Sequence, residues 1–269
     1  MGERELIERT DLPATASSIV RDLRALGVET GSLVIVHSSM KALGYVAGGA
    51  HAVVLALLEA VGSDGTLVMP THSSQLTDPA GWQNPPVPEA WGPVMRAEMP
   101  PYDPYVTPTR MMGAIVECFR TVPGVMRSGH PVVSAAAIGP LAAEIVGDHP
   151  LDDGLGPRSP QGRIRELDGQ VLLLGVGHAN NTSLHVAEFL SAAPDAPTES
   201  QSSPMLVDGE HRWVDHVSLA TREDDFAEIG EAFAATGQER SGPVAGATGR
   251  LMRSRDLIDF ATDWMRRHR

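Results

Sequence analysis

Apolar and polar positions alternate along the first part of the chain in a pattern that predicts a helix, a strand, a second helix and a second strand. Apolar residues recur at helical spacing over residues 13–27, and a short β-branched run at 33–36 predicts a buried strand. A largely apolar helix is expected at 48–60, and residues 66–69 resemble the first strand. Strand, helix and strand in this order are typical of a parallel sheet. The pattern therefore predicts an α/β fold.

The second half of the chain repeats this mixture. Residues 171–176 are a continuous apolar run, which is expected of a central strand covered on both faces. Either Asn181 or Thr182 starts the next predicted helix, and residues 205–219 resemble a hairpin with its turn at Asp208-Gly209. A further strand is expected at 132–138. Helices are expected at about 111–121, 140–146, 159–166 (with Ser159 as its cap), 224–236 and 254–267.

Two long segments lack a regular pattern. Residues 74–109 are crowded with prolines and also hold tryptophans and tyrosines, which favours a binding loop over a disordered linker. The second irregular segment is residues 148–160, and a further candidate substrate loop covers about residues 195–225, around the predicted hairpin. We therefore expect one domain over residues 1–269, with irregular substrate loops at about 74–109 and 195–225.

Composition narrows the class of protein. Aromatic residues make up 4% of the chain and the formal net charge is -13, which together argue against a nucleic-acid partner. An acidic surface would attract a cationic ligand, although it equally serves solubility. Cys118 is the single cysteine and lies in an apolar run, so we expect a buried, inert thiol. No window approaches the roughly 20 apolar residues of a membrane span, and no secretory signal is recognisable, which favours a cytoplasmic protein without a membrane partner.

Three predicted strands end in polar clusters that each contain a histidine. These clusters are His37-Ser38-Ser39, Thr71-His72-Ser73 and residues 177–182. Ligands of open α/β sheets bind beyond the carboxyl ends of the strands, so the clusters are candidates to converge on a site. The alternative is that polar residues lie there only because loops begin at strand ends.

The sharpest local signal lies in the predicted helix that follows the last cluster. His185 and Glu188 are three residues apart and share a helix face, with Thr182 one turn earlier. A carboxylate beside an imidazole fixes its tautomer and stabilises its protonated form, as a general base requires. A surface hydrogen bond without a catalytic role would give the same spacing.

Other motifs point to fewer possibilities. No histidine or cysteine pair has a zinc-ligand spacing, so no metal is expected. A phosphate-binding Walker loop is also missing. The absence of a serine-hydrolase elbow weakens a serine hydrolase reading. Residues 107–113 lie at a predicted helix start, where amides, hydroxyls and an arginine suit a phosphate group. Residues 127–131 form a second basic turn. Each of these two segments is equally readable as a plain cap or turn.

Taken together, short motifs in a fixed order resemble the aminoglycoside 3-N-acetyltransferase family (the antibiotic N-acetyltransferases). The segment from Leu167 to Glu188 is most similar to the branch that includes apramycin-acetylating enzymes. The matching segments span roughly residues 33–190 and comprise Val36-His37-Ser38-Ser39, residues 65–70, residues 107–113, residues 127–131, residues 167–177 and residues 181–188.

The resemblance implies a family-specific fold, with a central, mostly parallel sheet flanked by helices, distinct from the better-known N-acetyltransferase fold. It implies transfer of an acetyl group from acetyl-CoA to the 3-amino group of 2-deoxystreptamine aminoglycosides, which gives antibiotic resistance, without a covalent acyl-enzyme. His185 would be the general base and Glu188 would orient it. His37 and Thr182 match positions of the family's active centre and would assist at the thioester carbonyl, the leaving thiolate or a proton relay.

On the same basis, we expect acetyl-CoA as co-substrate, a cationic aminoglycoside as acceptor, and a monomer or homodimer. The candidates for contacts with CoA are Ser38, Ser39, Thr107, Thr109 and Arg110. Carboxylates are expected to bind the cationic acceptor, and the candidates are Asp78, Asp103, Glu223 and Asp224.

Three other functions remain open from the sequence. An acetyltransferase of this fold with another amine substrate is the main alternative. A thioester hydrolase would use His185 with Ser183 or a bound water, and would release CoA thiol without an amine. A drug-binding protein without catalytic activity is the third, and it would still protect cells after loss of His185.

Overall fold

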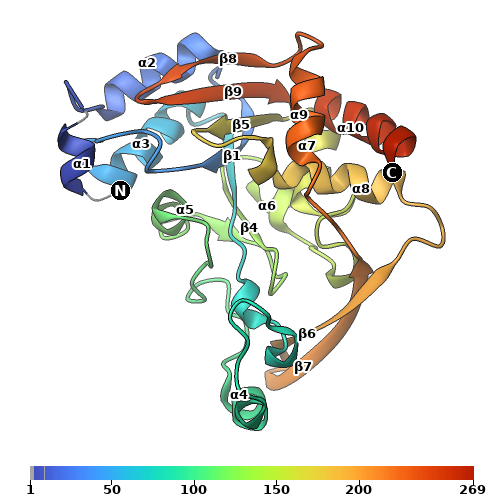
Figure 1. Ribbon diagram of the computed structural model, residues 1–269. Helices are drawn as coiled ribbons and strands as arrows, with labels where there is room; N and C mark the ends of the chain where they lie inside the picture. Colours follow the sequence, from blue (N-terminus) through green and yellow to red (C-terminus); the bar gives the residue numbers. More distant parts are fainter. Residues whose placement is uncertain (1–2, 9) are drawn as a thin grey trace.

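The computed structural model describes residues 3–8 and 10–269 and is built around a mixed sheet (Figure 1). Three strands at its centre run parallel: β2 (Thr66–Pro70), β1 (Leu33–Ser38) and β5 (Gln170–Leu174). The outer strands pair antiparallel, so parallel pairing is confined to the centre. Among the described residues the sheet has seven strands in the order β3-β4-β2-β1-β5-β9-β8, where the outer ones are β3 (Met126–Arg127), β4 (Ala135–Ile138), β8 (Arg240–Val244) and β9 (Ala247–Arg253).

Helices cover both faces of this sheet, which explains why its central strands are apolar throughout. Alternate residues of β1 enter two separate cores: Val34 and Val36 one, Leu33 and Ile35 the other. On the first face lie α2 (Ala16–Leu26), α3 (Gly49–Val61) and α5 (Ala114–Phe119). On the second face lie α6 (Ala142–Val146), α7 (Pro160–Glu166), α8 (His185–Ser191), α9 (Phe226–Ala234) and α10 (Ser254–His268).

Local signals in the sequence explain where several of these helices begin and end. Thr15 accepts a hydrogen bond from the Ser18 amide and so caps the start of α2, while Gly27, with φ of 115°, ends it in the left-handed conformation. Ser159 caps α7 through the Gly162 amide, as predicted. The predicted helices and strands of the core are thus confirmed to within a few residues. The sequence reading did not foresee α1 (Glu3–Glu8), α4 (Gly92–Glu98), β3, β8 or β9.

The two expected substrate loops contain more structure than their composition suggests. Residues 74–109 include α4 and three short 3-10 helices, η1 (Ser74–Leu76), η2 (Pro79–Gly81) and η3 (Glu89–Trp91). Most of 195–225 is not irregular but a long hairpin of β6 (Thr198–Val207) and β7 (Glu210–Leu219). Its turn lies at Asp208-Gly209, as predicted, with positive φ at both residues.

These two segments together form an outer lobe, defined here as residues 74–109 and 198–219. Figure 1 shows α4 and the hairpin projecting away from the sheet. Backbone and side-chain hydrogen bonds join the two halves of the lobe: the Tyr102 amide donates to Pro204 O at 2.8 Å, and Trp213 Nε1 donates to Arg96 O at 2.8 Å. The lobe is therefore one connected structure rather than two independent loops.

The structure also bears on the single cysteine and on the absence of a predicted membrane span. Cys118 in α5 is half-buried and packs against the core of the first face, so it is less enclosed than its apolar neighbours suggest. Across residues 3–8 and 10–269, no helix has the length and apolar character needed to span a bilayer.

Candidate active site

Four histidines gather beyond the carboxyl ends of the three parallel strands. His37 lies at the end of β1, His72 follows β2, and His178 follows β5 in η5 (His178–Asn180). Burial, and then the nearby His178 and His185, lower the pKa of His37 from 6.5 to about 3. Burial, and then His185 and His37, lower the pKa of His72 to about 3 as well. The polar clusters at the strand ends therefore converge, as predicted, and both imidazoles are neutral at pH 7.

His185 and Glu188 form a buried pair. His185 Nδ1 lies 2.6 Å from Glu188 Oε2, and the two side chains are 10% and 3% exposed. An ionised carboxylate only accepts hydrogen bonds, so Nδ1 donates and Nε2 carries the lone pair when the ring is neutral. The ring also meets the edge of Phe226, with centroids 4.9 Å apart. Such a ring is oriented to accept a proton at Nε2.

Glu188 is itself held by a cation from the far end of the chain. Arg269 Nη1 donates to Glu188 Oε1 at 2.5 Å, and the Arg222 amide donates to the same oxygen at 2.9 Å. Arg269 also forms a two-pronged ion pair with Asp225, whose pKa is lowered by those hydrogen bonds. Sequence reasoning missed Arg269 because it lies 81 residues from Glu188 and no local spacing connects them.

A second histidine has a similar pair of partners. His178 Nε2 lies 2.8 Å from Glu239 Oε2, and Arg250 Nη1 donates to Glu239 Oε1 at 2.5 Å. Burial opposes ionisation of Glu239, but the hydrogen bonds from His178 and Arg250 outweigh it and lower the pKa of this carboxyl. The sequence drew attention to His178 but not to Glu239 or Arg250, which lie between two predicted helices where no element was predicted.

The other residues predicted near the thioester lie around this histidine group. Thr182 begins η6 (Thr182–Leu184), one turn before His185, and its Oγ1 is 3.5 Å from Gln161 Nε2. His37 Nε2 and Ser38 Oγ are buried and have no hydrogen-bond partner among the described residues. Buried polar atoms without partners are uncommon, and these two are available to a bound ligand. The Ser39 amide instead bonds Leu174 O at 3.0 Å.

The predicted phosphate-binding segment is mostly engaged in internal contacts. Thr107 accepts from the Asp103 amide at 2.9 Å, and the Thr109 amide donates to Glu117 Oε1 at 2.7 Å. Burial would raise the pKa of Glu117, but bonds from Arg120 and Thr109 outweigh it and lower this pKa. A carboxylate therefore lies where a pyrophosphate was expected. Arg110 lies over the Trp82 ring at 5.8 Å, so its guanidinium is the part of this segment that remains suited to an anion.

The basic turn at 127–131 acts as a structural brace. Arg127 Nη1 donates to Thr107 O and Nη2 to Thr71 O, both at 2.6 Å. The Tyr102 hydroxyl donates to Ser128 O at 2.7 Å, and the Arg127 guanidinium lies over the Tyr102 ring. The alternative of a plain turn is therefore the better description. This turn fastens the outer lobe to the end of β2.

The four predicted acceptor-binding acids lie in two separate places. Asp78 caps η2 and pairs with Arg96, while Asp103 accepts from the Tyr105 amide at 2.8 Å. Glu223 and Asp224 are exposed and immediately precede Asp225, which shares Arg269 with Glu188. The first two acids thus belong to the outer lobe and the last two to the surroundings of the His185–Glu188 pair.

Asp78 also lines a cavity of about 580 Å³ between η2, α4 and the hairpin. Glu199 and Asp215 are further carboxylates on its wall, and Arg96 is its cationic residue within the described chain. Sequence reasoning did not select Glu199 or Asp215, because their alternation along two paired strands becomes visible only once the hairpin register is known.

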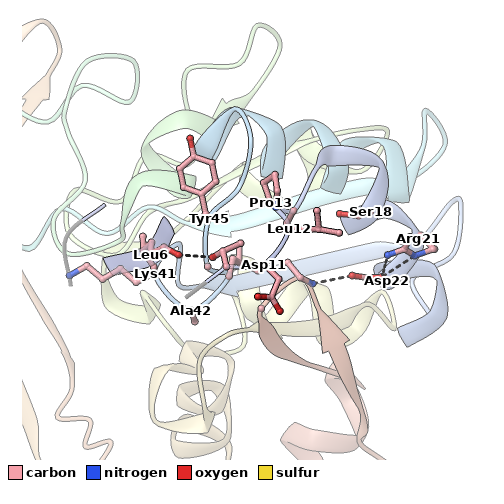
Figure 2. Close-up of a pocket in the computed structure, with 16 residues that line it drawn as sticks. Leu6, Asp11, Leu12, Pro13, Ser18, Arg21, Asp22, Lys41, Ala42 and Tyr45 are labelled. Carbon is pink, nitrogen blue, oxygen red and sulfur yellow. Dashed lines mark hydrogen bonds and ion pairs between the residues drawn. The ribbon is translucent and has the colours of Figure 1, made fainter. Parts of the chain in front are cut away.

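A separate cavity of about 700 Å³ lies beside α1, α2 and the turn between β8 and β9 (Figure 2). Figure 2 shows Arg21 joined to Asp22 on its wall, and Asp22 in turn accepts from the Ala245 amide. Lys41 also lines it, but the predicted site residues are not among its described lining residues. The candidate active site is therefore defined by the histidine group. Over residues 3–8 and 10–269, no cluster of three or more His, Cys, Asp or Glu side chains is arranged to hold a metal ion.

Comparison with known proteins agrees with this geometry. The family model of aminoglycoside 3-N-acetyltransferase matches residues 35–266. The chain is 42% identical to the prophage-derived aminoglycoside N(3')-acetyltransferase-like protein YokD of Bacillus subtilis, covering 97% of this chain and 96% of that protein. It is 38% identical to aminoglycoside N(3)-acetyltransferase VII of Streptomyces paromomycinus, covering 98% and 96%.

Solved structures give the same result. The crystal structure of YokD superposes with a TM-score of 0.95 at 41% identity, covering 98% of both chains. The binary complex of AAC-IIIb with CoASH has a TM-score of 0.85 at 31% identity, covering 95% and 97%. Sisomicin-bound AAC-VIa has a TM-score of 0.85 at 33% identity, covering 95% and 99%.

These matches extend over nearly the whole chain, and the solved structures share its fold. The protein therefore belongs to the aminoglycoside 3-N-acetyltransferase family, a family of acyltransferases, as its sequence motifs predict. Its fold is that of the aminoglycoside acetyltransferases. The resemblance to the apramycin-acetylating branch stays a prediction.

Proposed function

We propose that this protein transfers the acetyl group of acetyl-CoA to the 3-amino group of a 2-deoxystreptamine aminoglycoside and thereby inactivates the antibiotic. The buried pair of His185 and Glu188 carries the proposal, because its hydrogen bond leaves Nε2 of a neutral imidazole free to accept a proton. Family membership supplies the donor and acceptor classes. Because acetyl-CoA is an intracellular metabolite, the proposed reaction takes place in the cytoplasm.

The reaction needs one base and no covalent intermediate. The amine nitrogen of the acceptor attacks the thioester carbonyl carbon while His185 Nε2 takes a proton from that nitrogen. The C–S bond then breaks, CoA leaves as a thiolate, and the imidazolium returns the proton to the sulfur. Glu188 stabilises the transient imidazolium through Nδ1, and the hydrogen bond from Arg269 holds Glu188 in place. The products are an amide and CoA thiol.

The donor side of the site is supported by the unpartnered atoms at the end of β1. His37 Nε2 and Ser38 Oγ are buried and able to bond the thioester carbonyl or the pantetheine amides. Because the pKa of His37 is about 3, its ring is neutral and can donate or accept without adding a charge. Thr182, at the start of η6, offers a further hydroxyl on the His185 side. AAC-IIIb, which shares this fold, was solved with CoASH.

The remaining proposed contacts with acetyl-CoA come from the segment of residues 107–110. Arg110 is our candidate for the pyrophosphate of CoA, with Ser39, Thr107 and Thr109 as its neighbours in the predicted set. The hydrogen bonds of Thr107 and Thr109 to Asp103 and Glu117 imply that these two threonines act mainly by holding the segment that carries Arg110.

The acceptor side is supported by the distribution of carboxylates. An aminoglycoside carries several ammonium groups, which carboxylates attract over a distance comparable to the Debye length. The cavity lined by Asp78, Glu199 and Asp215 provides such charges on the outer lobe, and Glu223 with Asp224 provides them near the base. Sisomicin-bound AAC-VIa shares this fold. We propose that these carboxylates bind the cationic acceptor.

The structure gives less support to a hydrolase. The Ser183 side chain is 1% exposed, and its Oγ has no partner among the described residues, so it is not bonded to His185. A serine nucleophile needs that bond to lose its proton. A transferase that uses another amine remains the alternative, and the outer lobe decides between the two because it carries most of the acceptor-binding carboxylates.

The test is a thiol-release assay with purified protein and acetyl-CoA. Apramycin, gentamicin, kanamycin, sisomicin or no amine is added, and His185→Ala is measured in parallel, with mass spectrometry and NMR locating the acetyl group. Loss of a general base should lower turnover by roughly 10²–10⁴-fold. A Cys118→Ser control removes any background from the protein's own thiol.

Each outcome discriminates between the functions. Drug-dependent turnover that collapses in His185→Ala, with the acetyl group on the 3-amino nitrogen, supports the proposal. Thiol release without an amine would support a hydrolase instead. A folded protein that binds acetyl-CoA but acetylates none of the drugs would refute the aminoglycoside assignment. Undiminished drug resistance in cells that express His185→Ala would point to drug binding without catalysis.

A further inference from the structure

We infer that Arg250, Glu239 and His178 form a positioning chain that fixes the Asn181 amide and, through it, the segment that carries Thr182 and His185. The inference deepens the proposed function and rests on it, because His185 is taken as the base. Arg250, Glu239, His178 and Asn181 make no hydrogen bond to the His185 ring, whose partner is Glu188. The positioning chain therefore affects where His185 lies and does not take part in the proton transfer itself.

The first link fixes the tautomer of His178. Glu239 is 2% exposed and accepts from Arg250 at Oε1. The hydrogen bonds from His178 and Arg250 lower the pKa of Glu239, so this carboxyl is ionised and can only accept. His178 Nε2, 2.8 Å from Oε2, must therefore donate. A neutral His178 then presents a lone pair at Nδ1.

The second link fixes the orientation of Asn181. Its Nδ2 lies 3.5 Å from His178 Nδ1, and its Oδ1 accepts from the Ser183 amide at 3.2 Å. An amide nitrogen only donates, so it matches a lone pair at Nδ1. If Nδ1 carried the proton, two donors would face each other. The Asn181 amide would then turn over and point its NH2 group at the Ser183 N–H, and the cap would be lost.

Close packing around His178 prevents its ring from rotating or shifting to relieve a clash of two donors. His178 is 6% exposed and Asn181 is fully buried. Gly230 in α9 packs directly against the ring, since a Cβ atom at that position would lie 2.1 Å from His178 Cγ. The tautomer of His178 is therefore the variable that decides which end of the Asn181 amide faces the cap.

The third link reaches the base. Asn181 caps η6, which continues without interruption into α8, so Thr182 and His185 lie one and four residues after the cap. Loss of the cap displaces this turn relative to the strand ends that hold the donor. A misplacement of about 1 Å can lower a rate by roughly 100-fold without a matching change in binding. Substitutions in the positioning chain of Arg250, Glu239 and His178 should therefore change kcat more than KM.

Glu239→Gln is the primary test, because it keeps the shape and removes the charge. We expect kcat to fall roughly 10- to 100-fold while KM for acetyl-CoA changes less than about twofold. In protein labelled with ¹⁵N-histidine, the wild type should show the proton of His178 on Nε2, and the variant should show a mixture of tautomers. Arg250→Lys should retain most of the activity because it keeps the cation.

A matched control separates this effect from general loss of an ion pair. Asp259→Asn breaks the exposed ion pair with Arg165, whose atoms are 2.5 Å apart, on the helix α10. This variant should leave kcat and the His178 resonances unchanged. Melting temperatures of all variants identify any that are simply unfolded.

Asn181→Asp tests whether the effect passes through the amide. Aspartate caps as well as asparagine does, and both ends of its side chain are oxygen, so its orientation no longer matters. It also accepts a proton from Nδ1, the tautomer that Glu239→Gln permits. The double variant should therefore have a kcat at least about 5-fold above the product of the two single effects, which is a measurable coupling.

Several outcomes would overturn the inference. Additive losses in the double variant would show that Glu239 does not act through Asn181. An Nε2-protonated His178 in Glu239→Gln would break the first link. Because the tautomer measurement needs no substrate, it decides the inference even if no aminoglycoside is acetylated. In that case unchanged His185 resonances in Glu239→Gln would refute it, and the failure of the proposed function would be visible separately in the wild type.

Discussion

Replacing Arg269 by alanine removes the cation that holds Glu188. The wild-type guanidinium donates to Glu188 Oε1, to both carboxylate oxygens of Asp225 and to Arg222 O. The variant leaves Glu188, 3% exposed, with two of its hydrogen bonds, from His185 and from the Arg222 amide. We therefore expect losses of both stability and activity, because one residue connects the C-terminal helix to the base.

The magnitude follows from the burial of the pair. Removing one partner of a fully buried ion pair costs about 3–5 kcal/mol. Arg269 is 16% exposed and Glu188 keeps two donors, so we expect a smaller cost of about 2–3 kcal/mol. For a chain of this size, that corresponds to a decrease in Tm of about 4–12 °C. Because Glu188 loses one of the two donors at Oε1 and orients His185 less firmly, kcat should fall by roughly 10-fold or more.

The stability difference should also depend on pH. The hydrogen bonds and charge of Arg269 hold the pKa of Asp225 below its ordinary 3.8. A carboxyl with a depressed pKa stabilises the fold above its unfolded pKa and loses that effect as pH falls through its folded pKa. The difference between wild type and Arg269→Ala should therefore be full at pH 7 and shrink below about pH 4.

Urea unfolding at pH 7 and pH 3.5, together with kcat at pH 7, tests this reasoning. Arg266→Ala is the matched control, because Arg266 has exposed contacts and lies in the last turn of α10, just before Arg269. Arg269→Lys should recover part of the stability but less of the activity, since lysine cannot bond Glu188 and Asp225 in the same fork. Equal stability of Arg269→Ala and Arg266→Ala at pH 7 would refute the argument.

Two other predictions concern the acceptor and the histidine group. Asp78→Asn removes a carboxylate from the outer-lobe cavity and leaves Arg96 unpaired, so KM for an aminoglycoside should rise roughly two- to fivefold while KM for acetyl-CoA stays constant. An unchanged drug KM would exclude this cavity from the acceptor site. Folding lowers the pKa of His37 from 6.5 to about 3. Between these pH values the unfolded chain binds a proton at His37 and the native state does not, so the free energy of unfolding decreases as pH falls. His37→Asn should flatten this decline, measured by urea unfolding between pH 7 and pH 4, by up to about 1 kcal/mol per pH unit.

The core of the fold could be predicted because its signals are local. The continuous apolar run of β5 and the capping residues of α2 each lie within a dozen residues. By contrast, β8 and β9 contain Gly242, Pro243 and Gly249, which obscure the alternation expected of a strand. The first half of β6 is polar on both faces, so only its pairing with β7 identifies it as a strand.

The candidate site divides in the same way. His185 and Glu188 were recognisable because their partnership is a helix spacing of three residues. The partners that complete the two histidine pairs, Arg269 and Glu239, lie 81 and 61 residues away and are brought in by the packing of α10 and by the segment before β8. The segment predicted to bind the pyrophosphate precedes the helix α5, as the sequence indicates, but no local pattern revealed that Glu117 would accept a hydrogen bond from the Thr109 amide.

The brace around Arg127 has a consequence for how this protein can change over evolutionary time. The histidines are attached to the sheet and its first turns, whereas Asp78, Glu199 and Asp215 belong to the outer lobe, which is fastened by Arg127 and Tyr102. If these lobe carboxylates bind the acceptor as proposed, substitutions on the free surface of the lobe can alter which cation is recognised without disturbing the histidines. Drug spectrum would then change largely on a different part of the molecule from catalytic power, so a lineage exposed to a new antibiotic could adapt the first while it preserves the second.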